Sequence, residues 1–314
     1  IRPNACKKVM KIQENISLRP FTTFRIGGAA RFFAEPRSEK ELANVIEWAQ
    51  KHSSRIFVLG GGSNILIPDS DFDGLIIRLD FKGIKVHETT VIAGASVLLD
   101  DVISKTLKAG LVGLELAAGI PGTIGGAVRG NAGTFGENIG DRIASVSYFS
   151  QGAMHTLDRS ACDFKYRDSI FKRSSFIITS CTLELPRGDT KSSKHIIDDR
   201  KRVRRESHPL EPSAGCIFKN VEFARIDIEE LAKRDIDISR FEKFKKIPSG
   251  YLIESLGLKG KKIGGAQVSE KHGNYIINTG AATFEDVIML VSYIKQQVRD
   301  AYNIQLDEEV QILQ

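Results

Sequence analysis

Two glycine-rich loops are the segments whose residue types and spacing are best suited to chemistry. The first is Gly60-Gly61-Gly62-Ser63-Asn64, which follows an apolar run. Successive glycines let backbone N–H groups converge on a phosphate without obstruction by Cβ atoms, and the serine and asparagine add side-chain donors. A tight turn after a strand is an equally good interpretation of this loop taken alone.

The second loop, residues 119–136, is harder to explain as a turn because it holds seven glycines, far more than a turn needs. So many glycines lose much conformational entropy on folding, which suggests that the backbone approaches a large ligand closely. Two such loops in one domain suit a pyrophosphate joined to a flat ring, as in a flavin dinucleotide. The candidate ligand residues in this segment are Gly119, Gly122, Thr123, Ile124, Gly125, Gly126, Asn131 and Ala132.

Several other kinds of site are excluded by the sequence. Neither loop has the G-x-G-x-x-G spacing of a Rossmann dinucleotide site, and no G-x-x-x-x-G-K-[ST] phosphate loop occurs. The four cysteines, Cys6, Cys162, Cys181 and Cys216, form no C-x-x-C pair, and the six histidines form no H-E-x-x-H pair, so no metal site is predicted. No apolar run approaches the roughly 18 residues of a membrane span, so none is expected.

The hydrophobic pattern predicts the elements that must position these loops. Ser38 and Glu41 form a capping box at the start of the first predicted helix. Predicted helices cover 39–52, 97–109, 195–206 and 284–302, and predicted strands cover 55–59, 74–79, 84–93, 144–149, 175–185, 216–219, 263–268, 274–278 and 309–313. The eight glycines between 119 and 140 argue against a helix or a long strand there. Irregular mixing of the two kinds of element indicates the α+β class.

Composition and charge place the chain among globular proteins. Its 314 residues, 41% of them hydrophobic, predict two or three domains and exclude a disordered or collagen-like chain. The net charge of +6 is unevenly spread: +4 over 1–186, +6 over 187–271 and −4 over 272–314. This excess indicates an anionic partner, either nucleic acid or a phosphorylated small molecule. The first nine residues lack the apolar core of a signal peptide, so we expect a natural start at Met10 and a cytoplasmic protein.

The chain resembles the UDP-N-acetylenolpyruvoylglucosamine reductase family in seven stretches that occur in the family's order. They are NISLRPFTTFRIGG (15–28), VLGGGSNIL (58–66), GLELAAGIPGTIGGAVRGNAGTFG (113–136), FKYRDSIFK (164–172), PSAGCIFKN (212–220), SGYLIESLGLKGKKIGGAQVSEKHGNYIIN (249–278) and LDEEV (306–310). Each alone is a weak signal, but their ordered combination over nearly the whole chain is specific. The short stretch between Arg167 and Pro212 resembles the branch of the family that lacks an extra tyrosine loop.

The resemblance implies an α+β fold in which a two-part FAD-binding module of the vanillyl-alcohol-oxidase (PCMH) type precedes a smaller α+β substrate-binding domain. The implied boundaries are 10–80 and 81–188 for the FAD-binding domains, 189–303 for the substrate-binding domain, and 304–314 for a terminal strand with a catalytic glutamate. The implied reaction is the NADPH-dependent reduction, through FAD, of UDP-N-acetylglucosamine enolpyruvate to UDP-N-acetylmuramate in peptidoglycan precursor synthesis. The resemblance further implies a cytoplasmic monomer that binds neither membranes nor nucleic acid.

The resemblance assigns catalytic roles to three residues. Arg167 matches the catalytic arginine of the family, and its guanidinium fork suits a carboxylate or an enolate. Glu309 matches a second active-site residue, with Glu308 as the alternative. Cys216 stands where the best-known members carry a serine that donates a proton, and a thiol with a pKa of about 8.5 is a competent acid while protonated. Without the resemblance, Arg167 suggests a surface ion pair, Glu309 suggests a run of solvated charges, and Cys216 suggests a buried thiol.

A further set of residues matches family positions that contact the substrate: Tyr166, Lys219, Asn220, His272 and Asn274. The lysine of this set is also a candidate for contact with the nicotinamide or with a substrate phosphate. Candidates for binding the diphosphate are Arg204, Arg205, Lys259, Lys261 and Lys262, and a solvated basic face explains each of these equally well.

Two other functions are compatible with parts of the sequence. A flavin-dependent oxidase of a small alcohol or lactone would share the glycine-rich loops but should lack the SAGCIFKN and LDEEV stretches. A basic nucleic-acid-binding protein is suggested by RKRVRR at 200–205, although this segment has no interleaved aromatic residues. Bound FAD, and NADPH oxidation that depends on the UDP-sugar substrate, would separate both alternatives from the reductase.

Overall fold

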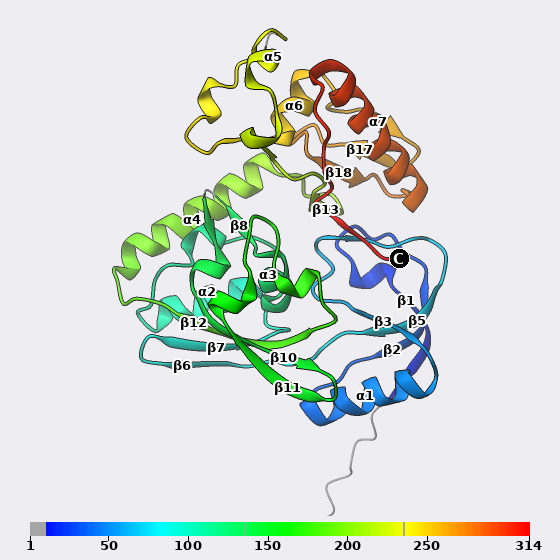
Figure 1. The fold of residues 1–314 in the computed structure, drawn as a ribbon, viewed down its shortest axis with the longest axis vertical. Helices are drawn as coiled ribbons and strands as arrows, with labels where there is room; N and C mark the ends of the chain where they lie inside the picture. The colour runs from blue at the N-terminus through cyan, green and yellow to red at the C-terminus, as the bar shows by residue number, and fades with distance from the viewer. Residues whose placement is uncertain (1–10, 135, 235) are drawn as a thin grey trace, which may run out of the picture.

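The structure is a computed structural model that describes residues 11–134, 136–234 and 236–314. The natural start predicted at Met10, and Cys6 with it, lie outside the described residues. Figure 1 shows three groups of elements, built in turn from the N-terminal, middle and C-terminal parts of the chain. None of the described helices combines the length and the hydrophobicity that a membrane crossing requires.

The N-terminal group is a four-stranded sheet covered by one helix. Its strands, in sheet order, are β1 (Gln13–Ser17), β2 (Ala29–Ala34), β5 (Phe72–Ile77) and β3 (Arg55–Val58), of which β1 is antiparallel to β2 and the other pairs are parallel. The side chains that α1 (Glu39–Lys51) buries against this sheet are Leu42, Val45 and Ala49. Ser38 accepts a hydrogen bond from the Glu41 N–H at 3.2 Å, but the Glu41 carboxylate accepts from Arg37 instead of Ser38. Only half of the predicted capping box therefore forms.

The middle group is a five-stranded antiparallel sheet with helices packed over it (Figure 1). Its strands, in sheet order, are β11 (Ala153–Asp158), β10 (Ile143–Ser150), β12 (Ile177–Glu184), β7 (Thr90–Gly94) and β6 (Ile84–His87). The remaining elements are α2 (Leu99–Lys108), α3 (Ile124–Gly130), the small hairpin of β8 (Gly133–Thr134) and β9 (Glu137–Asn138), and α4 (Thr190–Ser207) against α2. Phe149 and Ile177 join the buried cluster beneath α1, so the first two groups share part of a core.

The C-terminal group is built on a four-stranded antiparallel sheet. Its strands, in sheet order, are β13 (Ser213–Cys216), β18 (Tyr275–Asn278), β17 (Ala266–Val268) and β16 (Lys262–Ile263). The other elements are β14 (Val221–Glu222), β15 (Lys246–Ile247), α5 (Ile228–Ala232), α6 (Ser249–Ser255) and α7 (Phe284–Tyr302). As predicted, α7 begins at a Thr283 cap and buries one face, here against β16 and β17.

The C-terminal strand leaves its own group and joins the N-terminal one. β19 (Gln311–Ile312) pairs in parallel with β4 (Ile65–Leu66), which directly follows the first glycine-rich loop. Leu313 is 2% exposed and belongs to the core of the N-terminal group. Figure 1 shows this segment running down from the C-terminal group toward the N-terminal sheet. β19 therefore links the C-terminal group to the N-terminal group beside the first glycine-rich loop.

Three predicted strands are shorter or differently placed in the structure. The strand expected at 84–93 is a hairpin, because Glu88 adopts a left-handed backbone (φ 52°) in the turn between β6 and β7. The strand expected at 263–268 is split in the same way at Gly264 (φ 53°). The strand expected at 216–219 lies three residues earlier, as β13, so that Cys216 is its last residue.

Two helices also depart from the sequence expectations. The glycine density of 119–140 argues against a helix, yet α3 forms there. Its N-terminus is capped by Thr123, whose hydroxyl accepts from the Gly126 N–H at 3.4 Å, and its apolar side chains are buried. α4 starts at Thr190, earlier than expected, because Asp189 accepts from two N–H groups of its first turn.

Because Leu313 fills a buried site in the N-terminal core, we expect Leu313→Ala to lower the free energy of unfolding by about 2–5 kcal/mol. The matched control is Ile312→Ala in the same strand, where the side chain is 36% exposed and the loss should stay below about 1 kcal/mol. Urea unfolding followed by circular dichroism measures both values. Equal losses would show that this strand is not anchored through Leu313.

Candidate active site

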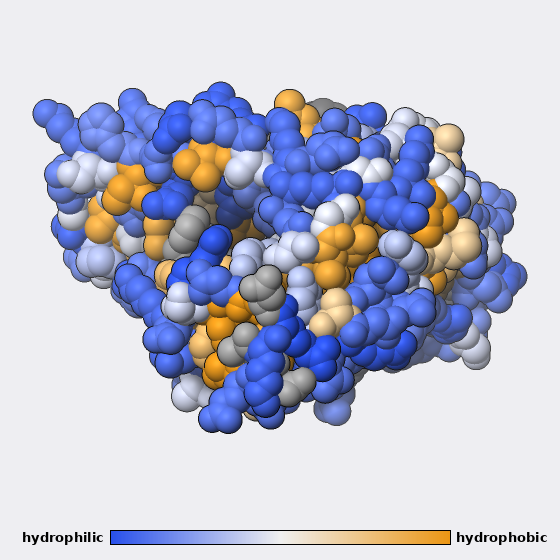
Figure 2. All heavy atoms as spheres, turned by 90° about the horizontal axis from the view of Figure 1, so that it is seen from above, coloured by the Kyte–Doolittle hydropathy of each residue, from blue (hydrophilic) through white to orange (hydrophobic). Residues whose placement is uncertain are grey.

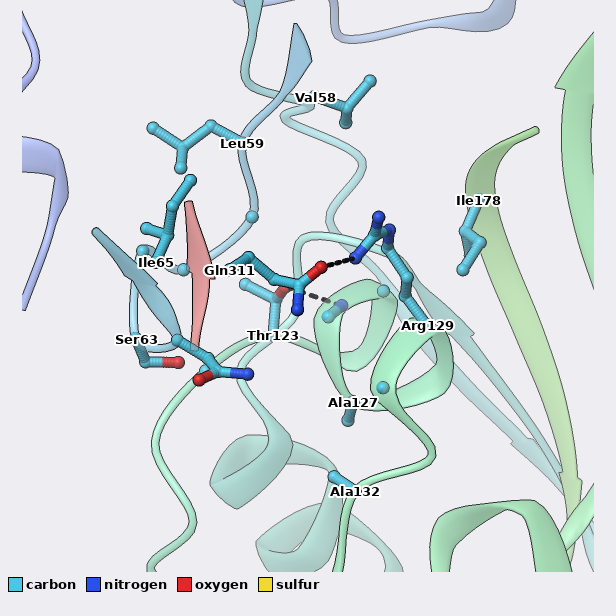
Figure 3. A pocket seen from close by; sticks show the side chains of 18 of the residues that line it. Val58, Leu59, Ser63, Ile65, Thr123, Ala127, Arg129, Ala132, Ile178 and Gln311 are labelled. Carbon is cyan, nitrogen blue, oxygen red and sulfur yellow. Dashed lines mark hydrogen bonds between the residues drawn. The ribbon is translucent and has the colours of Figure 1, made fainter. Parts of the chain in front are cut away.

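A cleft with a volume of about 1060 Å³ lies between the three groups and is lined by residues from each of them. Small-molecule sites reach about 1,000 Å³, so this cleft suits a ligand of dinucleotide size. Figure 3 looks into it from close by, with Ser63 from the first glycine-rich loop and Thr123 from the second. Arg129 of α3 and Gln311 of β19 point toward one another there, and Arg129 Nη1 donates to Gln311 Oε1 at 3.4 Å.

The two glycine-rich loops pack against each other beside this cleft. A Cβ atom on Gly61 would lie 3.0 Å from the Cα of Gly122, and the Ser63 hydroxyl donates to the Pro121 carbonyl at 3.0 Å. Gly62 has φ +65°, and a side chain there would collide with the backbone of the N-terminal group. Part of the glycine content therefore serves this contact between loops, which the sequence analysis did not predict.

The first loop also presents backbone donors without protein partners. Within the described residues, none of the N–H groups of residues 60–63 donates to a protein acceptor. Backbone N–H groups in folded proteins are almost always paired, so a row of unpaired ones beside a cleft is typical of an anion site. This loop therefore fits the phosphates of a dinucleotide cofactor such as FAD.

Most residues predicted to bind the cofactor line the cleft: Gly60, Gly61, Gly62, Ser63, Asn64, Gly122, Thr123, Gly125, Gly126 and Ala132. Three others do not. Ile124 is fully buried in the core of the middle group. Gly119 packs on Arg204, whose Cδ would lie 2.9 Å from an added Cβ. Asn131 is buried, and its carboxamide supports a neighbouring turn.

That turn carries Arg167 at its tip. Two backbone hydrogen bonds of 3.0 and 3.2 Å between Lys165 and Asp168 close it. Arg167 has a left-handed backbone (φ 56°), which residues with a Cβ rarely adopt. Asn131 Nδ2 donates to the Lys165 carbonyl at 2.9 Å, and the buried Ser169 hydroxyl donates to the α3 backbone at 2.7 Å. The turn is therefore fastened to the end of α3, beside the second glycine-rich loop.

Arg167 forms an ion pair with Glu309 across the cleft. Arg167 Nε lies 2.7 Å from Glu309 Oε1, although its N–H is not aligned as a hydrogen bond, and the two side chains are 22% and 17% exposed. Burial raises the pKa of Glu309, and the arginine opposes that rise. Glu308 instead pairs with Lys295 of α7 at 2.7 Å and does not line the cleft. Of the two candidate glutamates, Glu309 is the one in the cleft.

Cys216 lies beside this ion pair because its strand continues into contact with the glutamate segment. The Glu309 N–H donates to the Ile217 carbonyl at 2.7 Å, and Cys216 itself pairs in register with Tyr275 of β18. Burial, and next the Glu309 carboxylate, raise the pKa of the Cys216 thiol to about 12. The thiol is therefore protonated at neutral pH, as a proton donor must be.

Among the predicted substrate contacts, Asn220, His272 and Asn274 line the cleft, whereas Tyr166 and Lys219 are not among the lining residues. The Tyr166 hydroxyl accepts from the Asn220 backbone N–H at 3.2 Å. The Asn274 carboxamide donates to and accepts from the Phe218 backbone at 2.8 and 2.9 Å. Asn274 thus holds the strand that follows Cys216, which is a structural task the sequence did not indicate.

Two basic residues of the segment at 200–205 have carboxylate partners, one of them on α2. Arg202 pairs with Asp199 at 2.6 Å and with Glu206 at 2.9 Å, and Lys201 pairs with Asp100 at 2.8 Å. Of the candidate diphosphate residues, Arg204 lines the cleft, and Arg205, Lys259, Lys261 and Lys262 do not. Figure 2, the view from above, shows a mostly hydrophilic face with separate small apolar patches. These ion pairs weaken the case for a nucleic-acid surface on this helix.

Several cleft residues were missed by the sequence analysis. Lys172 lies at the end of the FKYRDSIFK stretch, and His208 stands before a proline, yet both line the cleft. His208 contacts the rings of His272 and Tyr275, and burial lowers its pKa to about 4. Arg129 is a third residue that lines the cleft but was not selected from the sequence. Lys172 and Arg129 both lie within stretches that carry the family resemblance, whereas no pattern in the sequence marks His208.

The arrangement combines an anion-binding loop, a cationic guanidinium held by a carboxylate, and a protonated thiol in one cleft. A guanidinium can stabilise a carboxylate or enolate, and a neighbouring acid can then deliver a proton to the adjacent carbon. Such a set suits the addition of a hydride and a proton across a double bond beside a carboxylate, with a flavin as hydride carrier.

Comparisons with known proteins match both halves of the chain. The FAD binding domain family model matches residues 30–153, and the model for the C-terminal domain of UDP-N-acetylenolpyruvoylglucosamine reductase matches residues 207–313. The second match covers both SAGCIFKN and LDEEV, the stretches that a flavin oxidase of small alcohols or lactones should lack. The expected α+β fold with an FAD-binding domain is confirmed.

Individual relatives match along nearly the whole chain. The UDP-N-acetylenolpyruvoylglucosamine reductase of Carboxydothermus hydrogenoformans is 39% identical over 308 residues, covering 96% of this chain and 94% of that protein. The enzyme of the same name from Solibacter usitatus is 34% identical over 304 residues, covering 96% of each. The crystal structure of the reductase (MurB) from Thermus caldophilus is 30% identical with a TM-score of 0.78, covering 97% of this chain and all of that one.

Because Glu309 lies close to Cys216, the effect of its carboxylate on the pKa of the thiol can be tested. The Glu309 carboxylate raises the pKa of the thiol, so Glu309→Gln should lower that pKa and increase alkylation of Cys216 by iodoacetamide at pH 9. Each unit of decrease in pKa gives about tenfold more thiolate and a correspondingly faster reaction. Peptide mass spectrometry measures the rate at this cysteine separately from the others.

The matched control is Glu308→Gln, which removes a carboxylate from the adjacent residue without changing the cleft. Its alkylation rate should equal that of the unmodified chain. If both glutamine variants leave the rate unchanged, the Glu309 carboxylate does not act on Cys216 in solution.

Proposed function

The chain belongs to the UDP-N-acetylenolpyruvoylglucosamine reductase family, and from that premise we propose that its cleft reduces UDP-N-acetylglucosamine enolpyruvate to UDP-N-acetylmuramate with NADPH. The product is a precursor of peptidoglycan. The observation that carries this proposal is the meeting of Arg167, Glu309 and Cys216 beside the glycine-rich loops. These three residues come from the parts of the chain that resemble the family most specifically.

The first task of the chain is to hold the cofactor. FAD, when bound, supplies the hydride chemistry, accepting a hydride from NADPH and delivering one to C3 of the enolpyruvyl group. We assign its phosphates to the unpaired N–H groups of residues 60–63, and its remaining contacts to the second loop, where Thr123 and Ala132 line the cleft.

The second task is to stabilise the charge that forms when a hydride reaches C3. Negative charge then develops on C2 and on the adjoining carboxylate of the substrate. The guanidinium of Arg167 suits this charge because its planar fork offers two donors to a carboxylate or enolate. Glu309 keeps the guanidinium oriented through the ion pair at 2.7 Å. Asn220 and His272 contact the remainder of the substrate from the wall of the cleft.

The third task is to deliver the proton. Cys216 gives its thiol proton to C2, which completes the saturated lactyl group, and the thiolate then regains a proton from solvent. The raised pKa of about 12 keeps the thiol protonated until charge develops beside it. Glu309 contributes to this protonated state, since its carboxylate disfavours the thiolate and so keeps the proton on Cys216 before the substrate carries charge.

We propose the domain division 10–80, 81–188, 189–303 and 304–314 for this chain. Support comes from the buried clusters, because the middle and C-terminal groups have cores of their own and Leu313, near the end of the last segment, joins the N-terminal core. The start of that segment still packs in the C-terminal core, through Leu306 and Val310. We also propose that the protein acts as a cytoplasmic monomer, since the cleft contains all the proposed catalytic groups within one chain and its reductant and nucleotide-sugar substrate are soluble metabolites.

We expect the purified protein to be yellow with bound FAD, and to oxidise NADPH only when UDP-N-acetylglucosamine enolpyruvate is supplied. Absorbance of the flavin and of NADPH measures both properties, and product mass should rise by that of two hydrogen atoms. A chain that cannot be loaded with FAD would overturn the proposed function. FAD binding with NADPH oxidation that does not depend on the substrate would support an oxidase-like flavoenzyme instead.

The role of Cys216 is tested by Cys216→Ala in stopped-flow kinetics. Reduction of the flavin by NADPH should be unchanged, because no proton donor is needed there. Reoxidation of the flavin by the enolpyruvyl substrate should slow by about 10²–10⁴-fold, the usual contribution of a general acid. Cys216→Ser should recover part of this loss.

The control for this experiment is Cys181→Ala, which removes another buried thiol whose pKa burial raises to about 12, but which lies in β12 outside the cleft lining. Its rates should match those of the unmodified chain. A Cys216→Ala variant that reoxidises at the full rate would exclude Cys216 as the proton donor.

A further inference from the structure

We propose that Lys172 is a positioning residue that holds Arg167 in its left-handed turn from inside the cleft. The inference rests on the proposed function, because it assigns Lys172 a part in presenting the catalytic arginine. Lys172 contacts the backbone of Arg167 and makes no direct contact with Glu309, the ion-pair partner of the arginine.

The contact is a hydrogen bond from Lys172 Nζ to the carbonyl oxygen of Arg167 at 2.8 Å. The neighbouring Phe171 is 1% exposed, so the backbone that carries the lysine is anchored in the core of the middle group. Asn131 and Ser169 fasten the two sides of the turn with neutral hydrogen bonds. Lys172 therefore supplies a charge-assisted bond to the residue at the tip, where the backbone is least favourable.

The charged groups around Lys172 indicate that its ammonium has a role in the site. Two cations face it, Lys219 and Arg129, and two carboxylates face it, Glu309 and Asp168. Burial and the two cations lower the pKa of Lys172 to about 8. A lysine in such a place costs free energy unless its charge is used. The Arg167 carbonyl and the Glu309 carboxylate are the groups that gain from it.

A pH dependence follows from this placement. Below pH 8 the ammonium holds the Arg167 carbonyl through a charge-assisted hydrogen bond. Above pH 8 the neutral amine gives a weaker hydrogen bond and no charge. The rate at which substrate reoxidises the flavin should therefore fall on the alkaline side of pH 8.

The test compares Lys172→Met and Lys172→Arg in the FAD-loaded full chain. Lys172→Met should slow substrate-dependent flavin reoxidation about 10- to 100-fold at pH 7, with a larger effect on kcat than on KM. Lys172→Arg keeps a permanent charge, so it should recover most of the rate and lose the alkaline decline near pH 8. The control is Lys51→Met, since the Lys51 side chain is 68% exposed, pairs with Glu47 within α1 and does not line the cleft, and its kinetics should be unchanged.

A second measurement does not depend on turnover. Competitive acetylation of lysine amines, resolved by peptide mass spectrometry, should report a pKa of about 8 for Lys172, and a lower one in Glu309→Gln because a stabilising carboxylate is lost. An ordinary lysine pKa near 10.4 would overturn the inference whatever the activity. So would a Lys172→Met variant within twofold of the unmodified rate, or an alkaline decline that persists in Lys172→Arg.

The failure of this inference is distinguishable from failure of the proposed function. If the unmodified chain does not couple NADPH oxidation to the enolpyruvyl substrate, the proposed function is wrong and the role of Lys172 falls with it. If the unmodified chain turns over and the Lys172 variants behave like Lys51→Met, the function stands and only the positioning role is wrong.

Discussion

The ion pair between Arg167 and Glu309 is the interaction on which the rest of the site depends. Its partners come from the middle and C-terminal parts of the chain, and both side chains are mostly shielded from water. A shielded charge without a partner costs several kcal/mol or more, so each residue needs the other in place. The turn at 165–168, the return of β19 to β4, and the link from Asn64 Nδ2 to the Glu309 carbonyl at 3.2 Å together fix the geometry of this pair.

The glycine-rich loops serve two purposes at once. Gly61 and Gly122 let the two loops approach each other, and the backbone donors of residues 60–63 are left unpaired by that packing. The same loop leads directly into β4, which pairs with β19, the strand that begins two residues after Glu309. A ligand bound by the loop and the proposed catalytic glutamate are thus positioned by two paired segments. This coupling explains why substitutions in the loop should affect catalysis as well as cofactor retention.

Much of the fold was predictable from the sequence, because α1, α7 and the long strands have strong periodic patterns and capping residues. The hairpins at 84–93 and 263–268 were not, because a single left-handed residue divides a run that otherwise has the pattern of one strand. α3 was missed because its stability comes from the Thr123 cap and buried packing, which override the low helix propensity of glycine. Of the site, most residues selected from recognisable motifs line the cleft, but Arg129 and Lys172, which lie in the same motifs, were missed. His208 reaches the cleft through tertiary packing, which no local pattern reveals.

The pairing of β4 with β19 has a consequence for how the chain assembles. Asn64 and Glu309 are separated by 245 positions, so ribosomes produce the first glycine-rich loop long before the strand that completes its surroundings. During synthesis β4 is an unpaired edge, which is the kind of surface that invites pairing with other chains. Its length of two residues keeps that exposed edge short. The cleft is therefore a late product of folding, closed only when a distant segment returns to the first sheet.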